Sequence, residues 1–290
     1  LMWGLFPLYW PLLEPAGAVE ILAHRMFWSA VVMALVITVL RRWREVRALP
    51  ARTWGLIAAA AVLISVNWGV FIYAVNNGHV VEASLGYFIN PLVSVALAVL
   101  VLGERLAPIQ WAALAVAVPA VVLTAVGAGS IPWLALALAT SFGLYGLIKR
   151  IITIPAALSL LGESSVVLLP ALGFLIWLQA DGRGHFTGYG AGHMALIAAS
   201  GVVTALPLLL FGAAARLLPL SVLGFLLYIN PLTQFLLGVL WVHEHMSAAR
   251  WAGFTLLWLA LGMLSAEALL RSGRSRRQRR AVADLPVGSQ

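Results

Sequence analysis

Three titratable or charged side chains stand inside strongly apolar stretches of this sequence. His24 and Arg25 occur in VEILAHRMFWSA, and Glu163 occurs in SLLGESSVV. Histidine and glutamate can carry protons, and arginine pairs well with carboxylates. A charge inside a membrane-spanning helix is costly and marks function by default. We therefore predict that His24, Arg25 and Glu163 recognise charge or couple to protons.

Structural explanations remain open for the same residues. Arg25 is expected to lie only about 10 Å below the outer end of its helix, since the helical rise is about 1.5 Å per residue. Its side chain could then extend to the lipid headgroups. Glu163 could instead be a buried acid that is hydrogen-bonded to a neighbouring helix.

Two Ile-Asn-Pro steps in the sequence indicate a second group of candidate residues. Asn90-Pro91 and Asn230-Pro231 each lie at the centre of an apolar segment. Proline has no amide donor and obstructs the carbonyl four residues earlier, so each step frees polar groups in mid-membrane. We expect the steps to line a cavity at a hinge, and the alternative is a packing kink in which asparagine joins helices. The predicted cavity residues are Asn67, Trp68, Tyr73, Tyr87, Asn90, Pro91, Tyr145, Tyr228, Asn230, Pro231 and Gln234.

Metal and enzyme chemistry find little support in the sequence. The two histidines of His243-Glu244-His245 are two residues apart, so they would point to different helix faces. The chain has no cysteine and no GxSxG, HExxH or P-loop motif. We expect no metal, no cofactor, no catalytic residues and no enzyme activity.

The composition indicates which elements must position these residues. Only 10% of the 290 residues are charged, 62% are hydrophobic, and the mean hydropathy is +0.99. Soluble domains carry about 25% charged residues, so a soluble enzyme, a disordered protein and a soluble nucleic-acid binder are excluded. Apolar stretches of about 20 residues predict membrane-spanning helices. They lie near residues 18–40, 54–76, 80–102, 109–127, 132–149, 156–179, 192–215, 219–242 and 250–270. Residues 1–13 are also apolar, and because the chain opens on Leu1 we expect them to be a truncated first helix. With this helix counted, ten helices are expected.

The basic residues predict the orientation in the membrane. With the N-terminus in the cytoplasm, 15 of the 18 Lys and Arg residues fall on the cytoplasmic side. This bias follows the positive-inside rule, and an even number of helices then puts both termini in the cytoplasm. The net charge of +8 is explained by topology, so no nucleic-acid partner is expected. Residues 271–290 are expected to form a basic, disordered tail that solvates this side or attracts anionic lipids.

An internal repeat predicts the fold. Residues 87–111 and 227–251 match at nine of 25 positions without gaps, and the matches include Asn, Pro, Glu and Trp. The copies fall on the fourth and ninth expected helices, so each half has five helices and the second is inverted. The predicted fold is an all-α membrane protein of ten helices in a 5+5 inverted repeat, with halves at 1–127 and 132–270. Such repeats bind substrate near the membrane midplane. His24 and Glu163 would then lie toward opposite sides of one cavity.

Several stretches resemble a known family. ILAHR, NWGVFIYAVNNGHVVEASLGYFINPLVSVALAVLVLGERL and GFLLYINPLTQFLLGVL are similar to the RarD-type branch of the EamA family, in the drug/metabolite transporter superfamily. The resemblance covers nearly the whole chain. It implies a ten-helix carrier of the inner membrane that exports or exchanges small organic solutes.

These observations predict a secondary transporter that needs no ATP. It would move small organic solutes or drugs across the inner membrane by alternating access. Its partners would be the solute, membrane lipids and protons as the candidate coupling ion. The alternatives are an uncoupled facilitator of metabolite efflux and, from another class, a membrane scaffold or enzyme.

Overall fold

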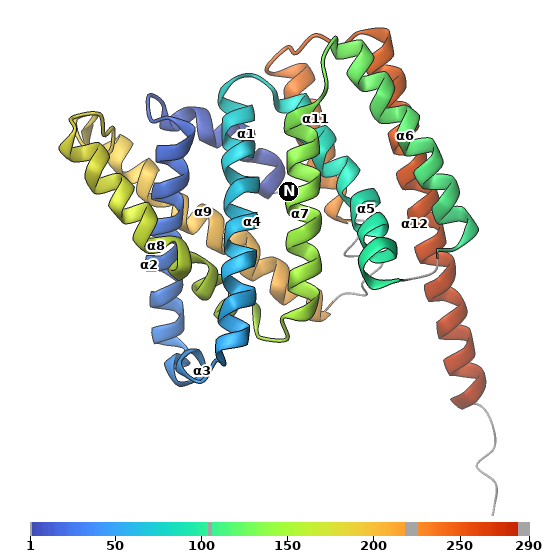
Figure 1. Ribbon diagram of the computed structural model, residues 1–290, viewed down its shortest axis with the longest axis horizontal. Coiled ribbons are helices and arrows are strands. Elements are labelled where there is room, and N and C mark those ends of the chain that lie inside the picture. Colours follow the sequence, from blue (N-terminus) through green and yellow to red (C-terminus); the bar gives the residue numbers. More distant parts are fainter. Residues whose placement is uncertain (1, 104–105, 218–225, 284–290) are drawn as a thin grey trace, which may run out of the picture.

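The computed structural model describes residues 2–103, 106–217 and 226–283, and within these ranges every regular element is a helix (Figure 1). The elements are η1 (Met2–Leu5), α1 (Phe6–Tyr9), η2 (Trp10–Leu13), α2 (Ala18–Val39), α3 (Trp43–Arg47), α4 (Ala51–Asn76), α5 (Val80–Leu102), α6 (Pro108–Ala128), α7 (Trp133–Ile151), α8 (Ala156–Ala180), α9 (Gly190–Leu217), α11 (Ile229–Leu240) and α12 (Ala248–Ala283).

The predicted spans correspond closely to the long helices. Eight of the described helices are long and apolar enough to cross a membrane. They are α2, α4, α5, α6, α7, α8, α9 and α12. Their exposed apolar faces would be unfavourable in water, so they require a lipid environment. The chain is a multi-pass membrane protein.

The predicted span 219–242 differs most from the structure. Residues 218–225 lie outside the described residues, and α11 is a short helix of 12 residues. Helical residues 226–227 are separated from α11 by a turn at Tyr228. Pro231 explains this interruption, because it has no amide hydrogen to donate to the carbonyl of Leu227. In α5 the equivalent Pro91 stays inside one continuous helix.

Both ends of the chain also differ from expectation. Residues 2–13 form three short turns, η1, α1 and η2, in place of one regular helix. Pro7 and Pro11 are the second residues of α1 and η2, where proline is tolerated but prevents an earlier helix from continuing. At the other end α12 continues to Ala283, so residues 271–283 are helical where disorder was expected. Arginine, glutamine and alanine are good helix formers, which accounts for this extension.

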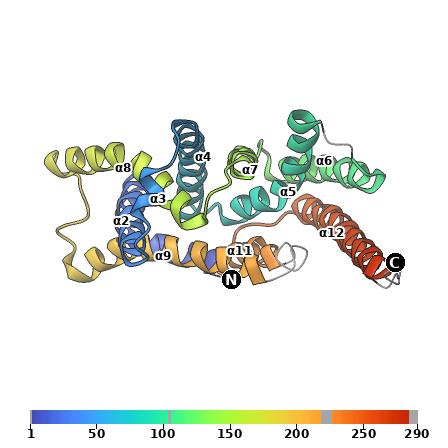
Figure 2. The ribbon, with the colours of Figure 1, turned by 90° about the horizontal axis from the view of Figure 1, so that it is seen from below.

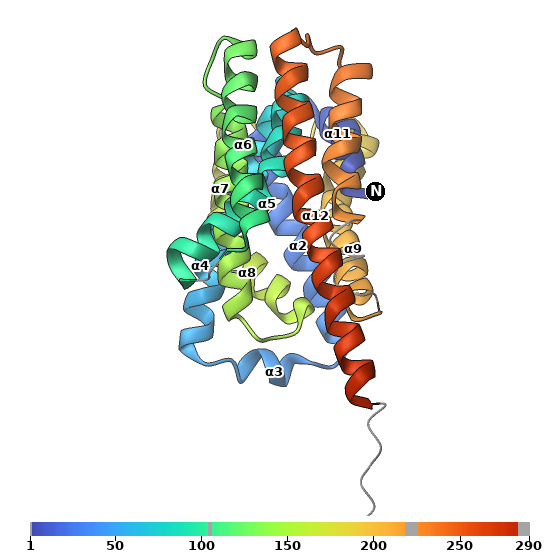
Figure 3. The same cartoon turned by 90° about the vertical axis from the view of Figure 1, so that its right-hand side faces the viewer.

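The helices are arranged in two rows. Seen from below, α8, α4, α7 and α6 form one row, and α9, α11 and α12 form the other (Figure 2). Helix α2 lies between the rows at one end, and α5 lies between them toward the other. Figure 3 shows α6 beside α12 and α3 at the end toward which α12 extends.

Acidic side chains hold two helix ends in place. Glu244, in the connection from α11 to α12, accepts a hydrogen bond from the Val81 amide at 2.7 Å. Glu82 accepts one from the Leu134 amide at 3.0 Å. The first amides of a helix have no partner within the helix, and the helix dipole favours a carboxylate there. Burial raises the pKa of Glu244, while the amide of Val81 and the charge of Arg250 act in the opposite direction.

Close contact between α2 and α9 depends on a glycine. A Cβ atom at Gly201 would lie 2.4 Å from the carbonyl carbon of Trp28. The adjacent Ser29, Ser200 and Thr204 are fully buried. Small residues that let two backbones approach are typical of helix packing in membranes.

We predict that Gly201→Ala destabilises the protein. The added methyl group must push α9 away from α2, and overpacking of this kind costs about 1–3 kcal/mol. The measurement is unfolding of the purified protein in mixed micelles titrated with SDS. Gly173→Ala on α8 is the matched control, because nothing lies within 4 Å of a Cβ there. Equal stability of the two variants would contradict the close packing of α2 and α9.

Candidate functional site

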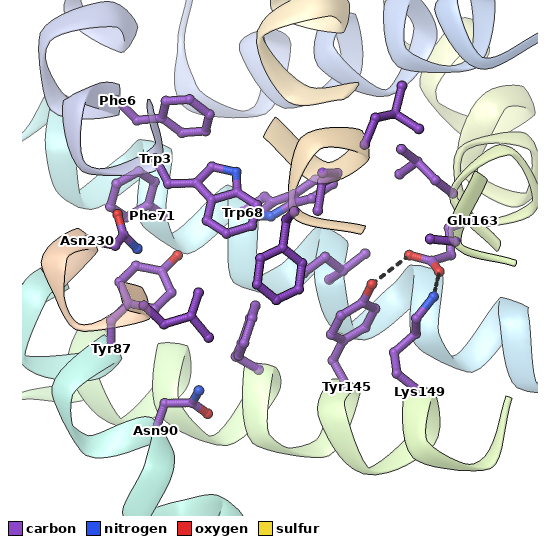
Figure 4. A pocket seen from close by; sticks show the side chains of 18 of the residues that line it. Trp3, Phe6, Trp68, Phe71, Tyr87, Asn90, Tyr145, Lys149, Glu163 and Asn230 are labelled. Atoms are coloured by element: carbon purple, nitrogen blue, oxygen red, sulfur yellow. Dashed lines mark hydrogen bonds and ion pairs between the residues drawn. The ribbon is translucent and has the colours of Figure 1, made fainter. Parts of the chain in front are cut away.

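One cavity of about 1240 Å³ lies between the two rows of helices. Nine of the eleven cavity residues predicted from the sequence line it, and Figure 4 draws most of its walls. These nine are Trp68, Tyr87, Asn90, Pro91, Tyr145, Tyr228, Asn230, Pro231 and Gln234. Asn230 and Tyr87 lie at one end of the view, and Glu163 and Lys149 lie at the other (Figure 4).

Asn67 and Tyr73, the other two predicted cavity residues, do not line the cavity. Asn67 is fully buried and its amide donates to the carbonyl of Leu138 at 2.9 Å and to Ser141 Oγ at 3.1 Å. Its Oδ1 accepts a hydrogen bond from the Tyr87 hydroxyl at 3.2 Å. Asn67 therefore joins α4 to α7 and positions Tyr87 in the cavity wall. Tyr73 is 51% exposed on the outer surface of the bundle.

The two Asn-Pro steps come to the same cavity from α5 and α11. Asn230 Oδ1 accepts a hydrogen bond from Gln234 Nε2 at 3.2 Å, and the same nitrogen donates to the carbonyl of Trp3 at 3.2 Å. Asn90 differs, because its buried Oδ1 has no hydrogen-bond partner among the described residues. Most buried polar atoms in proteins are paired, so the Asn90 oxygen is suited to accept a hydrogen bond from a solute or water.

Arg25 is buried in an aromatic cage and also lines the cavity. The residue is only 2% exposed. Its guanidinium carbon lies 3.7 Å from the ring centre of Trp68, 5.0 Å from that of Trp10 and 5.7 Å from that of Phe6. Arg25 therefore does not extend to the lipid headgroups, which was the structural alternative.

His24 lies outside the cavity, although it adjoins Arg25 in sequence. Its ring stacks on Phe186 with the centroids 4.9 Å apart. One helical turn earlier, Glu20 accepts hydrogen bonds from the amide of His185 at 2.6 Å and pairs with its Nδ1 at 2.7 Å. The structure thus uses this face of α2 to hold the connection between α8 and α9.

Glu163 lines the cavity as the centre of a polar cluster. Its Oε1 accepts hydrogen bonds from Lys149 Nζ at 2.8 Å and Ser159 Oγ at 2.7 Å. Its Oε2 accepts one from the Tyr145 hydroxyl at 3.1 Å. Lys149 also donates to Ser159. The buried carboxylate is thereby bonded to neighbouring helix α7, and Figure 4 shows this contact at the edge of the cavity.

The cavity reaches the surface beside two connections between helices. Its lining includes Arg42, between α2 and α3, and residues 154–157, at the end of the connection from α7 and the start of α8. The Arg42 side chain is 30% exposed and forms an ion pair with Glu45 at 2.5 Å. This end of the molecule is the one that carries α3, which Figure 1 places at the bottom.

Comparison with known proteins gives the family. Residues 1–126 match the EamA-like transporter family. The protein RarD of Streptomyces exfoliatus is 55% identical over 284 residues, which cover 97% of this chain and 90% of that protein. The chain belongs to the RarD branch of the EamA family. The uncharacterized transporter YojE of Bacillus subtilis (strain 168) is 46% identical over 270 residues, which cover 90% of this chain and 89% of that protein.

The fold is shared more widely. One solved crystal structure matches with a TM-score of 0.61 at 17% sequence identity, over 91% of this chain and 93% of that one. At this identity the match shows the fold alone. Membership of the EamA family makes the protein a multi-pass membrane transporter of a small solute.

Lys149 is among the cavity residues of this EamA protein that sequence reasoning missed, as are the aromatic residues Trp3, Phe6, Phe71, Phe142 and Phe211. It was counted only among the basic residues that set the orientation, because it lies at the end of a predicted span. Its spacing of four residues from Tyr145 puts both on one face of α7, and that was the available signal. Both side chains meet Glu163, so the cluster is one interacting unit.

We predict strong energetic coupling between Lys149 and Glu163. Removing one partner leaves the other without its opposite charge. Each single substitution, Lys149→Met or Glu163→Gln, should therefore lower the free energy of unfolding more than the double substitution does. The double-mutant cycle should give a coupling energy of about 1–2 kcal/mol, given the partial exposure of Lys149. The free energy of unfolding in mixed micelles is the quantity to measure. The matched control is the exposed pair Arg42 and Glu45, for which the cycle should show little coupling. Additive effects at Lys149 and Glu163 would contradict the cluster.

Proposed function

We propose that this protein is a secondary transporter that moves small organic solutes across the bacterial inner membrane by alternating access, without ATP. The observation that carries the proposal is the cavity between the two Asn-Pro steps of α5 and α11. Aromatic and aliphatic walls with a few polar groups are typical of sites for small organic molecules. Membership of a transporter family argues against the scaffold and enzyme alternatives.

The packing of the helices supports two related halves, at residues 1–127 and 132–270. Helix α5 packs on α11, α6 on α12 and α2 on α8. These are the pairs that the 140-residue offset makes equivalent in a 5+5 inverted repeat, with residues 2–13 in the place of a first helix. Inverted halves give two near-equivalent packings, one open to each side of the membrane.

The position of the cavity opening supports a state that is open to the cytoplasm. The opening lies beside Arg42 and residues 154–157, at the end rich in basic residues. By the positive-inside rule this end faces the cytoplasm, and both termini then lie there as well. In the outward-open state this end would be closed.

We predict that Asn90→Ala impairs transport while the protein still folds. Loss of the amide removes a hydrogen bond to the solute, so the initial rate should fall by about tenfold or more. The assay is uptake into proteoliposomes from a mixture of organic acids, amino acids and aromatic drugs, measured by mass spectrometry. Asn77→Ala is the matched control, because Asn77 is exposed in a turn and bonds the carbonyl of Tyr73. Unaltered transport by Asn90→Ala would remove Asn90 from the site.

A second candidate function is uncoupled facilitation of metabolite efflux. Glu163 is the carboxylate among the described cavity residues, and it already accepts three hydrogen bonds and pairs with Lys149. These contacts leave no unpartnered carboxylate among the described lining residues. This favours transport driven by the solute gradient alone.

The response to a pH gradient separates the two candidates. For a proton-coupled carrier, a gradient of about two pH units should raise the initial rate several-fold, and Glu163→Gln should abolish that increase. For a facilitator, the gradient should leave the initial rate unchanged in both the wild type and Glu163→Gln. The same proteoliposomes serve for the measurement, with a protonophore as the control for the imposed gradient.

A further inference from the structure

Arg25 stands out because its charge is not balanced inside the protein. Its Nε and Nη1 atoms are buried without a hydrogen-bond partner, and no described carboxylate forms an ion pair with it. An unpaired buried charge is costly in apolar surroundings. The three aromatic rings offset part of this cost through cation–π interactions. They do not satisfy the N–H donors of the guanidinium group.

Stacking on Trp68 leaves the edge of the Arg25 guanidinium group for hydrogen bonding. Trp68 lies 3.7 Å from the guanidinium carbon, the distance of a ring stacked on the flat face of the group. The N–H donors of arginine lie in the plane of the guanidinium, so stacking leaves them available at its edge. A carboxylate is the partner whose two oxygens match that edge.

The other cations that line the cavity already have partners. Lys149 pairs with Glu163 at 2.8 Å, and Arg42 pairs with Glu45 at 2.5 Å. Among the described residues of the lining, Arg25 therefore carries the uncompensated positive charge. A ligand with one negative charge would balance it.

The walls around Arg25 indicate the rest of the ligand. Phe71, Phe142, Phe211 and Trp3 line the same cavity, and flat apolar groups pack well on aromatic rings. We infer that the cavity binds small organic carboxylates with an aromatic body, with the acid group on the edge of Arg25 and the ring among these side chains. This inference rests on the proposed function, since it names the class of solute for the same cavity.

Binding to the purified protein tests the inference without transport. The probes are benzoate, phenylacetate, 3-phenylpropanoate and indole-3-acetate, each compared with its neutral amide and with the corresponding amine, by calorimetry in detergent. At least one acid should bind about tenfold or more tightly than its amide, because two charge-assisted hydrogen bonds are lost in the amide. Amides or amines that bind as tightly as all the acids would overturn the inference.

Two variants assign the preference to Arg25. Arg25→Gln should remove the preference for acid over amide. Arg25→Lys should reduce it about threefold or more, because lysine keeps the charge but cannot donate two parallel hydrogen bonds to a carboxylate. Arg183→Gln is the matched control, because Arg183 also lies over a tryptophan, Trp177, but does not line the cavity. A preference that survives unchanged in Arg25→Lys, or that falls equally in Arg183→Gln, would overturn the assignment.

The outcomes separate this inference from the proposed function. Acids that bind through Arg25 but fail to cross proteoliposome membranes would support the ligand class and contradict transport of those acids. Solutes that cross the membrane at equal rates in wild type and Arg25→Gln, without preference for acids, would support transport and overturn the ligand class.

Discussion

The structure depends on one constraint, which is that hydrocarbon tolerates no unpaired polar group. Pro91 and Pro231 each remove a helical hydrogen bond in the middle of an apolar segment. The polar groups they release must face protein or water. Both steps indeed line the same cavity, together with their asparagines. The positions of the cavity and of the two Asn-Pro steps therefore follow from one requirement, and the sequence signal for the site is a proline inside an apolar segment.

The same constraint explains how a charge is kept beside the cavity. Arg25 could not lie in lipid, and the structure surrounds it with the rings of Trp68, Trp10 and Phe6. Two of these rings come from the short elements near the start of the chain, Phe6 from α1 and Trp10 from η2. The irregular start of the chain thus contributes directly to the cavity.

The sequence predicted the helices well because hydropathy alone determines a membrane span. It failed where another force competes, as at Tyr228, where Pro231 breaks the helix, and at residues 271–283, where helix formers extend α12. Side-chain direction was harder to predict. His24 and Arg25 are adjacent, yet only Arg25 lines the cavity, and the same holds for Asn67 and Trp68. Consecutive helical residues point about 100° apart, so a list of polar residues cannot say which ones face inward until the packing of the helices is known.

The two proposed halves are alike in some cavity features and different in others. The Asn-Pro steps of α5 and α11 correspond under the repeat, whereas Arg25 and Glu163 have no like counterpart at the offset of about 140 residues. Alternating access requires that two packings be nearly equal in energy, which favours features present in both halves. Recognition of a solute has no such requirement, because the same groups must contact it in both states. The shared Asn-Pro steps are thus suited to the motion, and the unmatched Arg25 and the Lys149–Glu163 pair are suited to selecting what is carried.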